Sequence, residues 1–208
     1  MKFVVISDTH GIHQQLNLPD ADVIIHAGDV SNLGKKEEIL FFLDWFSSLP
    51  YQHRIFIAGN HDFFFERNSP ADIFNIIPAG ITYLNDTGIN IEGIEIWGSP
   101  ITPWFNNWAF NRMRGADIRT HWSQIPDNVN VLITHGPPFR CLDFTIDKKN
   151  AGCKDLFNRI EEVNPSYHIF GHVHEGYGTM KRKDTTFINA SILDESYKMK
   201  NKPVIFEL

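Results

Sequence analysis

The sequence predicts an α/β fold in which two packed β-sheets are flanked by helices. Short apolar runs typical of buried strands alternate with an amphipathic helix in the first third, and antiparallel strands with tight turns follow in the middle. Strand and helix patterns resume towards the carboxyl end. The 208 residues suffice for one domain with a substantial core, and no repeat or linker divides residues 1–208.

The first third is expected to form a sheet covered by a helix. Strands are predicted up to residue 7, over 22–27 and over 54–58. Residues 36–49 carry apolar residues at spacings of three and four, which is typical of an amphipathic helix, and Pro50 marks its end. The apolar face of this helix should pack on the sheet.

The rest of the chain is expected to supply a second sheet and its helices. Residues 81–99 contain short apolar runs divided by Asp and Gly, a pattern that indicates antiparallel strands. An aromatic loop covers residues 104–108. The remaining expected elements are helices at 111–122 and 154–163 and strands at 131–134, 167–170, 176–180, 186–189 and 204–207.

The composition argues against several functional classes. Acidic and basic residues are scattered along a chain of net charge −6, so no basic stripe is available to bind duplex nucleic acid by counterion release. The two cysteines, Cys141 and Cys153, fit a reducing compartment and no structural disulfide. No apolar stretch reaches membrane-spanning length, so we expect a cytoplasmic protein with no membrane partner.

Polar motifs stand directly after five of the apolar runs. In α/β sheets, ligand sites lie at the carboxyl ends of strands, so the motifs are expected to come together there. Chance often supplies any one of them, but not all five at successive strand ends. The motifs are Asp8-Thr9-His10, Gly28-Asp29, Gly59-Asn60-His61-Asp62, Thr134-His135-Gly136 and Gly171-His172-Val173-His174.

The donor atoms in these motifs suit two divalent metal ions. Asp8 and His10 are two residues apart on extended chain and so point the same way, and Asp29 has two oxygens that can bridge two ions. Carboxylate, amide and imidazole donors together favour Mn, Fe, Zn or Ni over Mg or Ca, and the lack of cysteine argues against structural zinc. The candidate ligands are Asp8, His10, Asp29, Asn60, His135, His172 and His174.

Two metal ions held close together can clamp the attacking and leaving oxygens of an in-line displacement at phosphorus. The motifs therefore predict a phosphoesterase. His61 is not needed as a ligand and is the candidate general acid for the leaving oxygen. Asp62 either holds the other ring nitrogen of His61 and raises its pKa, or serves as a turn or helix N-cap residue.

A few residues outside the motifs are weaker candidates. Trp104, Phe105 and Trp108 could stack a nucleobase, although packing of their loop against the core is the commoner role. Arg140 could contact substrate phosphate or lie in solvent. His26 precedes the Gly28-Asp29 motif and is expected to support the ligands without binding metal itself.

The motifs resemble those of the calcineurin-like metallophosphoesterase superfamily, over nearly the whole chain. Within it, the chain is most similar to the metallophosphoesterase-domain-containing proteins best known from vertebrate brain, and to the related class III cyclic nucleotide phosphodiesterases. The resemblance implies a four-layer αββα sandwich of two mixed sheets flanked by helices. The further stretches that carry it are Gly98-Ser99-Pro100, Pro103-Trp104, Trp108-Ala109-Phe110, Pro137-Pro138, Gly152-Cys153 and Glu175-Gly176-Tyr177-Gly178.

The resemblance also implies roles for single residues. A hydroxide shared by two ions would attack phosphorus while His61 protonates the leaving oxygen. Some vertebrate members have glycine in place of the first histidine of Gly-His-x-His, whereas His172 is present here, so an active centre is expected. The implied ligands are Asp8, His10, Asp29 and His174 for one metal and Asp29, Asn60, His135 and His172 for the other, with Asp29 as the bridge.

The substrate class implied by the resemblance is phosphodiesters, including cyclic nucleotides, hydrolysed with Mn. The superfamily's protein phosphatases carry Gly-Asp-x-x-Asp-Arg-Gly where residues 28–34 here read Gly-Asp-Val-Ser-Asn-Leu-Gly, which disfavours a phosphoprotein substrate. A phosphomonoesterase or nuclease of the same superfamily is the alternative enzyme, and a catalytically weak nucleotide-binding scaffold is the alternative of another class. Family resemblance also suggests a homodimer.

Overall fold

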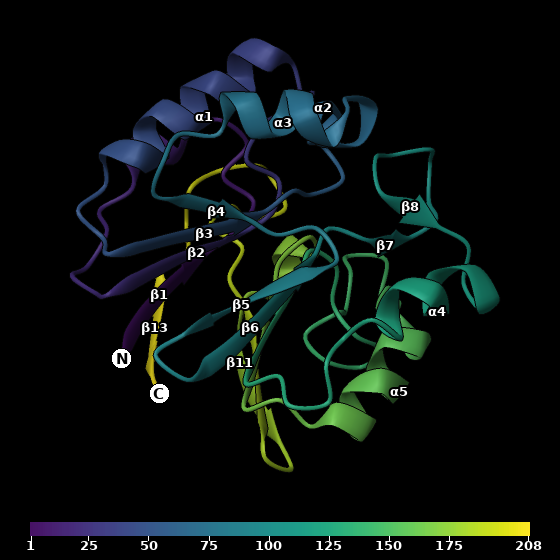
Figure 1. The fold of residues 1–208 in the computed structure, drawn as a ribbon. Coiled ribbons are helices and arrows are strands. Elements are labelled where there is room, and N and C mark those ends of the chain that lie inside the picture. The colour runs from purple at the N-terminus through teal and green to yellow at the C-terminus, as the bar shows by residue number, and fades with distance from the viewer.

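Two large mixed sheets form the centre of the computed structural model, which describes residues 1–208 (Figure 1). In order across the first sheet, the strands are β13 (Val204–Glu207), β1 (Lys2–Ile6), β2 (Val23–Ala27), β3 (His53–Ile57) and β4 (Ile81–Tyr83). Strands β1 to β4 are parallel, and β13 is antiparallel to β1. The two ends of the chain therefore lie side by side (Figure 1).

The second sheet has a parallel centre between two antiparallel edge strands. Its order is β11 (Gly178–Arg182), β12 (Thr185–Asn189), β10 (Tyr167–Phe170), β9 (Val131–Thr134), β6 (Ile94–Ser99) and β5 (Thr87–Ile91). Strands β12, β10, β9 and β6 are parallel, while β11 and β5 form the antiparallel edges. A separate two-stranded ribbon joins β7 (Thr102–Pro103) to β8 (Asn111–Arg112).

Helices cover the outer face of each sheet (Figure 1). On the first sheet these are α1 (Lys36–Ser48), α2 (Phe63–Arg67) and α3 (Pro70–Ile76), and on the second α4 (Ala116–Trp122) and α5 (Lys154–Val163). This arrangement confirms the predicted four-layer αββα fold class. Two single-turn 3₁₀ helices complete the elements, η1 (His13–Gln15) and η2 (His174–Gly176). No helix combines the length and apolar character needed to cross a membrane.

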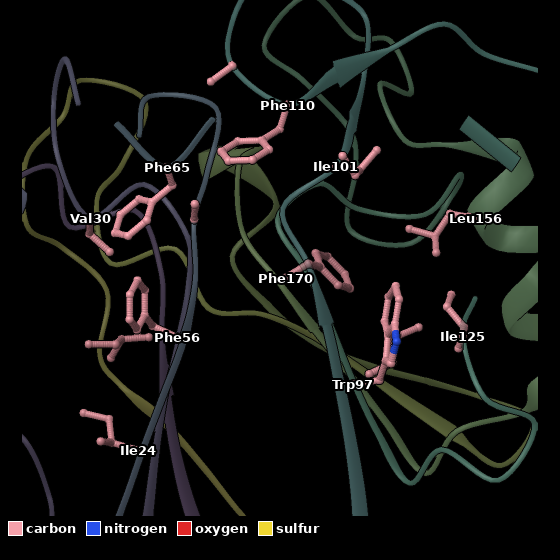
Figure 2. Close-up of a cluster of buried hydrophobic side chains, with 14 of the residues drawn as sticks. Ile24, Val30, Phe56, Phe65, Trp97, Ile101, Phe110, Ile125, Leu156 and Phe170 are labelled. Atoms are coloured by element: carbon pink, nitrogen blue, oxygen red, sulfur yellow. The ribbon is translucent and has the colours of Figure 1, made fainter. Parts of the chain in front are cut away.

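Apolar side chains fill both the gap between the sheets and the spaces beneath the helices. Along β1, Phe3 and Val5 belong to the cluster between the sheets, whereas Val4 and Ile6 belong to the larger cluster beneath the helices. The central strands are thus covered on both faces, which is why they read as continuous apolar runs in the sequence. Figure 2 shows part of the larger cluster, where Phe56 and Phe65 face one another.

The structure corrects two sequence predictions. Strand β4 belongs to the first sheet and is parallel to β3, although it was expected to start an antiparallel second sheet. Its Tyr83 ring packs on Phe56 and Phe65, with centroids 4.9 and 4.8 Å away, and this tertiary packing places the strand. The helix expected at 111–122 begins only at Ala116, because Gly115 takes a φ of 91° and Asn111 pairs in β8.

Removing the Phe56 ring tests the packing beneath the first helix layer. Phe56 is fully buried, and its centroid lies within 6.2 Å of four other aromatic rings. We expect Phe56→Ala to lower the free energy of unfolding by about 3–5 kcal/mol, measured by urea denaturation. Phe74→Ala is the control, since that ring is 78% exposed and its loss should cost within about 0.5 kcal/mol.

Candidate active site

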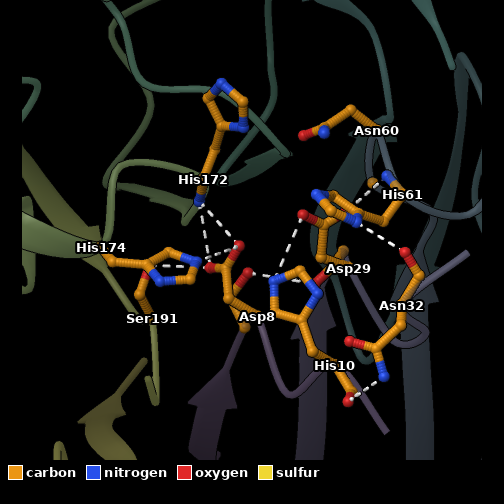
Figure 3. A network of polar contacts seen from close by, with 12 residues as sticks. Asp8, His10, Asp29, Asn32, Asn60, His61, His172, His174 and Ser191 are labelled. Carbon is orange, nitrogen blue, oxygen red and sulfur yellow. Dashed lines mark hydrogen bonds and ion pairs between the residues drawn. The ribbon is translucent and has the colours of Figure 1, made fainter. Parts of the chain in front are cut away.

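The five polar motifs meet where strand ends of the two sheets face each other. Figure 3 shows labelled side chains from all of them except Thr134-His135-Gly136. The motifs follow β1, β2, β3, β9 and β10, which are the strands expected to carry them. Backbone hydrogen bonds join the two sheets at this point, because Ser7 N donates to Ala190 O and Ile192 N donates to Ser7 O. The sheets therefore share one site at their carboxyl edges.

Side-chain donor atoms in this site form three overlapping groups, each with its ligand atoms within 4.8 Å of one another. Asn60 adds an amide oxygen, because its Oδ1 lies 2.9 Å from His135 Nε2. All seven predicted ligands are thus brought together, and His61 joins them. The groups are Asp8, His10 and His174; His10, Asp29 and His61; and Asp29, His135 and His172.

Unpaired nitrogens in the site fit divalent metal ions. Both ring nitrogens of His10 are buried without a hydrogen-bond partner, and its Nε2 lies 3.7 Å from Asp29 Oδ2. Buried polar atoms are normally hydrogen-bonded, so a bare imidazole facing a carboxylate calls for a cation between them. The mixture of imidazole, carboxylate and amide donors is also one that transition metals accept.

The two buried carboxylates are compensated by neighbouring imidazoles. Burial alone would raise the pKa of Asp8, but its ion pair with His174 at 3.6 Å and the charges of His135 and His10 outweigh burial and hold the pKa well below its usual range. Asp29 is shifted the same way, chiefly by His135. Against the opposing effect of burial, these carboxylates raise the pKa values of His135 and His174 to about 9. Because a metal binds the unprotonated nitrogen of a histidine, a cation at this site would compete with protons for these rings.

The backbone is strained where it presents the ligands. Four of the site residues have left-handed φ angles: 53° at Asp8, 41° at His10, 55° at Asp29 and 69° at His172. Such angles are uncommon outside glycine and cost free energy that the surrounding structure must supply. Gly171 must be glycine for a steric reason. A Cβ at this position would collide with the Asp8 carboxylate and the Ser7 side chain.

His61 is held over the donor groups from three sides. Its Nδ1 lies 2.7 Å from Asn32 O and, because a carbonyl only accepts, this nitrogen carries the proton. The ring stacks on Trp108 at 4.2 Å between centroids and meets His10 edge-on at 4.7 Å. Its backbone N also donates to Asp29 Oδ1 at 2.8 Å. Nε2 is therefore the ring nitrogen that remains free to exchange a proton with a substrate.

Asp62 does not hold the His61 ring, which corrects one of its two expected roles. Its carboxylate accepts hydrogen bonds from the amides of Val30, Ser31 and Gly59, at 2.8–3.1 Å, and from Ser31 Oγ at 2.6 Å. Burial and the Asp29 charge raise the pKa of Asp62 to about 6, so it remains ionised at neutral pH. Although Asp62 precedes α2, its side chain does not cap that helix. It ties the Asp29 loop to the Asn60 loop.

Two buried histidines support the ligand loops from below. His26 Nε2 lies 2.9 Å from Thr9 Oγ1, and His168 Nε2 lies 2.8 Å from Thr134 Oγ1. Burial lowers the pKa of each to about 3, so both rings are neutral. His26 thus contacts the ligand segment, as expected, and His168 makes the same kind of contact in the second sheet.

A cavity of about 450 Å³ opens above the donor groups. Trp104, Phe105 and Trp108 line it, and the Phe105 ring meets His172 edge-on at 5.1 Å. Arg140, for which a phosphate contact and a place in solvent were both left open, does not line the cavity, and its guanidinium lies over the Phe139 ring at 5.2 Å.

Three contributors to the site were not found from sequence. Ser191 Oγ donates to Asp8 Oδ2 at 2.7 Å, and its place just beyond the apolar run of β12 is the same signal that marked the other motifs. Tyr197 packs on His10 and His174 with centroids 4.9 and 5.1 Å away. Arg114 lines the cavity. The last two lie in irregular segments that no motif distinguishes.

Known proteins share this sequence pattern. The family profile described as calcineurin-like phosphoesterase matches residues 1–176. The chain belongs to the calcineurin-like phosphoesterase family. It is 39% identical to metallophosphoesterase domain-containing protein 1 of Homo sapiens over 230 residues, which cover 100% of this chain and 71% of that protein. A UPF0046 protein of Caenorhabditis elegans is 37% identical over 219 residues, which cover 99% of this chain and 74% of that protein.

Solved structures share the fold of this calcineurin-like phosphoesterase. Phosphopantetheinyl hydrolase from Mycobacterium tuberculosis superposes with a TM-score of 0.64 over 94% of this chain and 90% of that chain, at 16% sequence identity. Family membership confirms the resemblance inferred from the motifs and makes the chain a metallophosphoesterase-type phosphoester hydrolase. The His and Asp groups of the site provide the metal-binding capacity that such hydrolases need.

Replacing Asp62 tests whether it stabilises the loops of the site. We expect Asp62→Ala to lower the free energy of unfolding by about 3–5 kcal/mol, because three buried amides and a hydroxyl lose their acceptor. Ser31→Ala removes one of these bonds and should cost only about 1 kcal/mol. Urea denaturation of both variants measures the difference, and equal small losses would contradict this role of Asp62.

Proposed function

We propose that the protein is a phosphodiesterase that hydrolyses small phosphodiesters, with cyclic nucleotides as the substrate class. The observation that carries the proposal is the placement of His61, whose protonated Nδ1 is fixed by Asn32 O while Nε2 is left beside the donor groups. In the doubly protonated ring Nε2 also carries a proton, which it can give to the leaving oxygen next to the groups proposed to hold metal. Membership of a phosphoesterase family supports the reaction type.

The donor groups divide between two metal positions that share Asp29. When bound, two divalent ions supply positive charge for the phosphate oxygens and lower the pKa of a water molecule so that it can attack phosphorus. Mn, Fe, Zn and Ni all accept such donors. In this proposal the ligands are Asp8, His10, Asp29 and His174 at one position and Asp29, Asn60, His135 and His172 at the other.

The protein's own groups position the acid and the substrate. Trp108 stacks on the His61 ring and prevents it from turning away from the donor groups. Trp104, which is 52% exposed, offers an aromatic face in the cavity wall on which a base or an aryl ester could stack. Aromatic walls on an open cavity suit a phosphate esterified on both sides better than a small monoester.

Comparing two chromogenic esters tests the reaction class. We expect metal-stripped protein reloaded with Mn to hydrolyse bis-p-nitrophenyl phosphate with a kcat/KM well above that for p-nitrophenyl phosphate, because the cavity provides an aromatic wall for the second ester group. The release of p-nitrophenol is followed by absorbance. A preference for the monoester would make the protein a phosphomonoesterase, and no turnover with two metals bound would make it a binding scaffold.

A pair of neighbouring variants separates proton transfer from metal binding. We expect His61→Ala to keep both metals and to lose about 10²- to 10⁴-fold in kcat on a diester with a poor leaving group, because the departing alkoxide then lacks a proton donor. With p-nitrophenol as leaving group the loss should be smaller. Asn60→Ala should weaken one metal position instead, as measured by metal content after dialysis. Loss of metal from His61→Ala would contradict the proposed role, since His61 also belongs to one donor group.

A further inference from the structure

One arginine stands in the cavity wall apart from the metal donors. Arg114 is the only Lys or Arg among the residues that line the cavity. Its Nη1 donates to Gly152 O at 3.0 Å and its Nη2 donates to Ala151 O at 2.9 Å. These two bonds hold the guanidinium in place and use only part of its five N–H donors.

The segment that accepts the Arg114 hydrogen bonds and the backbone next to Arg114 are both held by further hydrogen bonds. Asp143, only 2% exposed, accepts hydrogen bonds from the amide of Gly152 at 3.0 Å and from Asn150 Nδ2 at 2.7 Å. On the other side, Gly115 N donates to Asp155 Oδ2 at 3.1 Å. Because both the side chain and its carbonyl partners are anchored, little conformational entropy is left to lose when a ligand binds to Arg114.

The charge of Arg114 is not neutralised by the protein. Its neighbours in sequence are paired, Arg112 with Glu66 and Arg119 with Asp155, at 3.3 and 3.0 Å. No carboxylate lies within 4.0 Å of the Arg114 guanidinium nitrogens. Glu175 also lines the cavity and accepts a hydrogen bond from Ile146 N at 2.8 Å, and it forms no ion pair with Arg114. An unpaired, preorganised guanidinium in a cavity wall is a ready site for an anion.

We propose that Arg114 binds a second phosphate of the substrate, separate from the phosphodiester that is cleaved. The substrate class is then nucleoside phosphodiesters that carry an additional phosphate group. A cavity of about 450 Å³ is large enough to hold a nucleoside with both groups. This inference rests on the proposed function, because it takes the donor groups to be the place where the first phosphate is bound.

Binding measurements test this inference without turnover. Mn-loaded protein is titrated calorimetrically with thymidine 3′,5′-bisphosphate and with thymidine 5′-monophosphate. We expect the bisphosphate to bind about tenfold more tightly, as one charge-assisted contact at a partly exposed site would give. Arg114→Ala should abolish that preference, and Arg114→Lys should restore part of it through the remaining charge. Arg140→Ala is the matched control and should keep the full preference, since Arg140 lies outside the cavity.

A turnover experiment with the same nucleoside separates this inference from the proposed function. The substrates are the p-nitrophenyl ester of thymidine 5′-phosphate with and without a 3′-phosphate, and the ratio of their kcat/KM values should fall from about ten to about one in Arg114→Ala. If Arg114 only ties two loops together, Arg114→Ala should change kcat/KM by the same factor for both substrates. That result overturns the inference. A third outcome is that neither ester is hydrolysed, while the protein still prefers the bisphosphate and Arg114→Ala abolishes that preference. This outcome overturns the phosphodiesterase proposal and leaves the inference about Arg114 standing.

Discussion

The burial of two carboxylates between the sheets is the constraint on which the rest of the site depends. Asp8 and Asp29 are at most 2% exposed, and two anions so deeply placed require cationic partners. Imidazoles supply part of this charge, and the same imidazoles and carboxylates form the groups whose ligand atoms are close enough together to hold a metal ion. The left-handed backbone at both aspartates is the conformational cost of presenting them at this depth.

Each sheet supports its share of the ligands in the same way. A neutral histidine on a buried strand contacts the hydroxyl of a threonine that adjoins a ligand: His26 with Thr9 in the first sheet and His168 with Thr134 in the second. Asp62 then ties two ligand loops of the first sheet to each other. The donor atoms are therefore positioned by buried hydrogen bonds, which limit the movement that would otherwise weaken metal binding.

The donor groups and the wall of the cavity come from different parts of the chain. Donor residues lie at the ends of sheet strands, whereas the cavity wall comes from irregular segments that contribute Trp104, Arg114 and Tyr197. Loops of this kind can change without disturbing the core, so a common catalytic centre can serve different esters. In the proposed function, the cavity wall is accordingly the part of the protein that selects the ester.

The sequence by itself determined the layered α/β fold and the seven polar residues that converge at the site, because apolar runs and the polar motifs that follow them are local patterns. Only the tertiary structure decided that β4 joins the first sheet, that Asn32 and not Asp62 holds His61, and that Arg114 and not Arg140 lines the cavity. These outcomes depend on contacts between residues far apart in the chain. Contacts between side chains of different loops produce no periodic pattern or fixed spacing in the sequence. They can therefore be identified only in the folded structure.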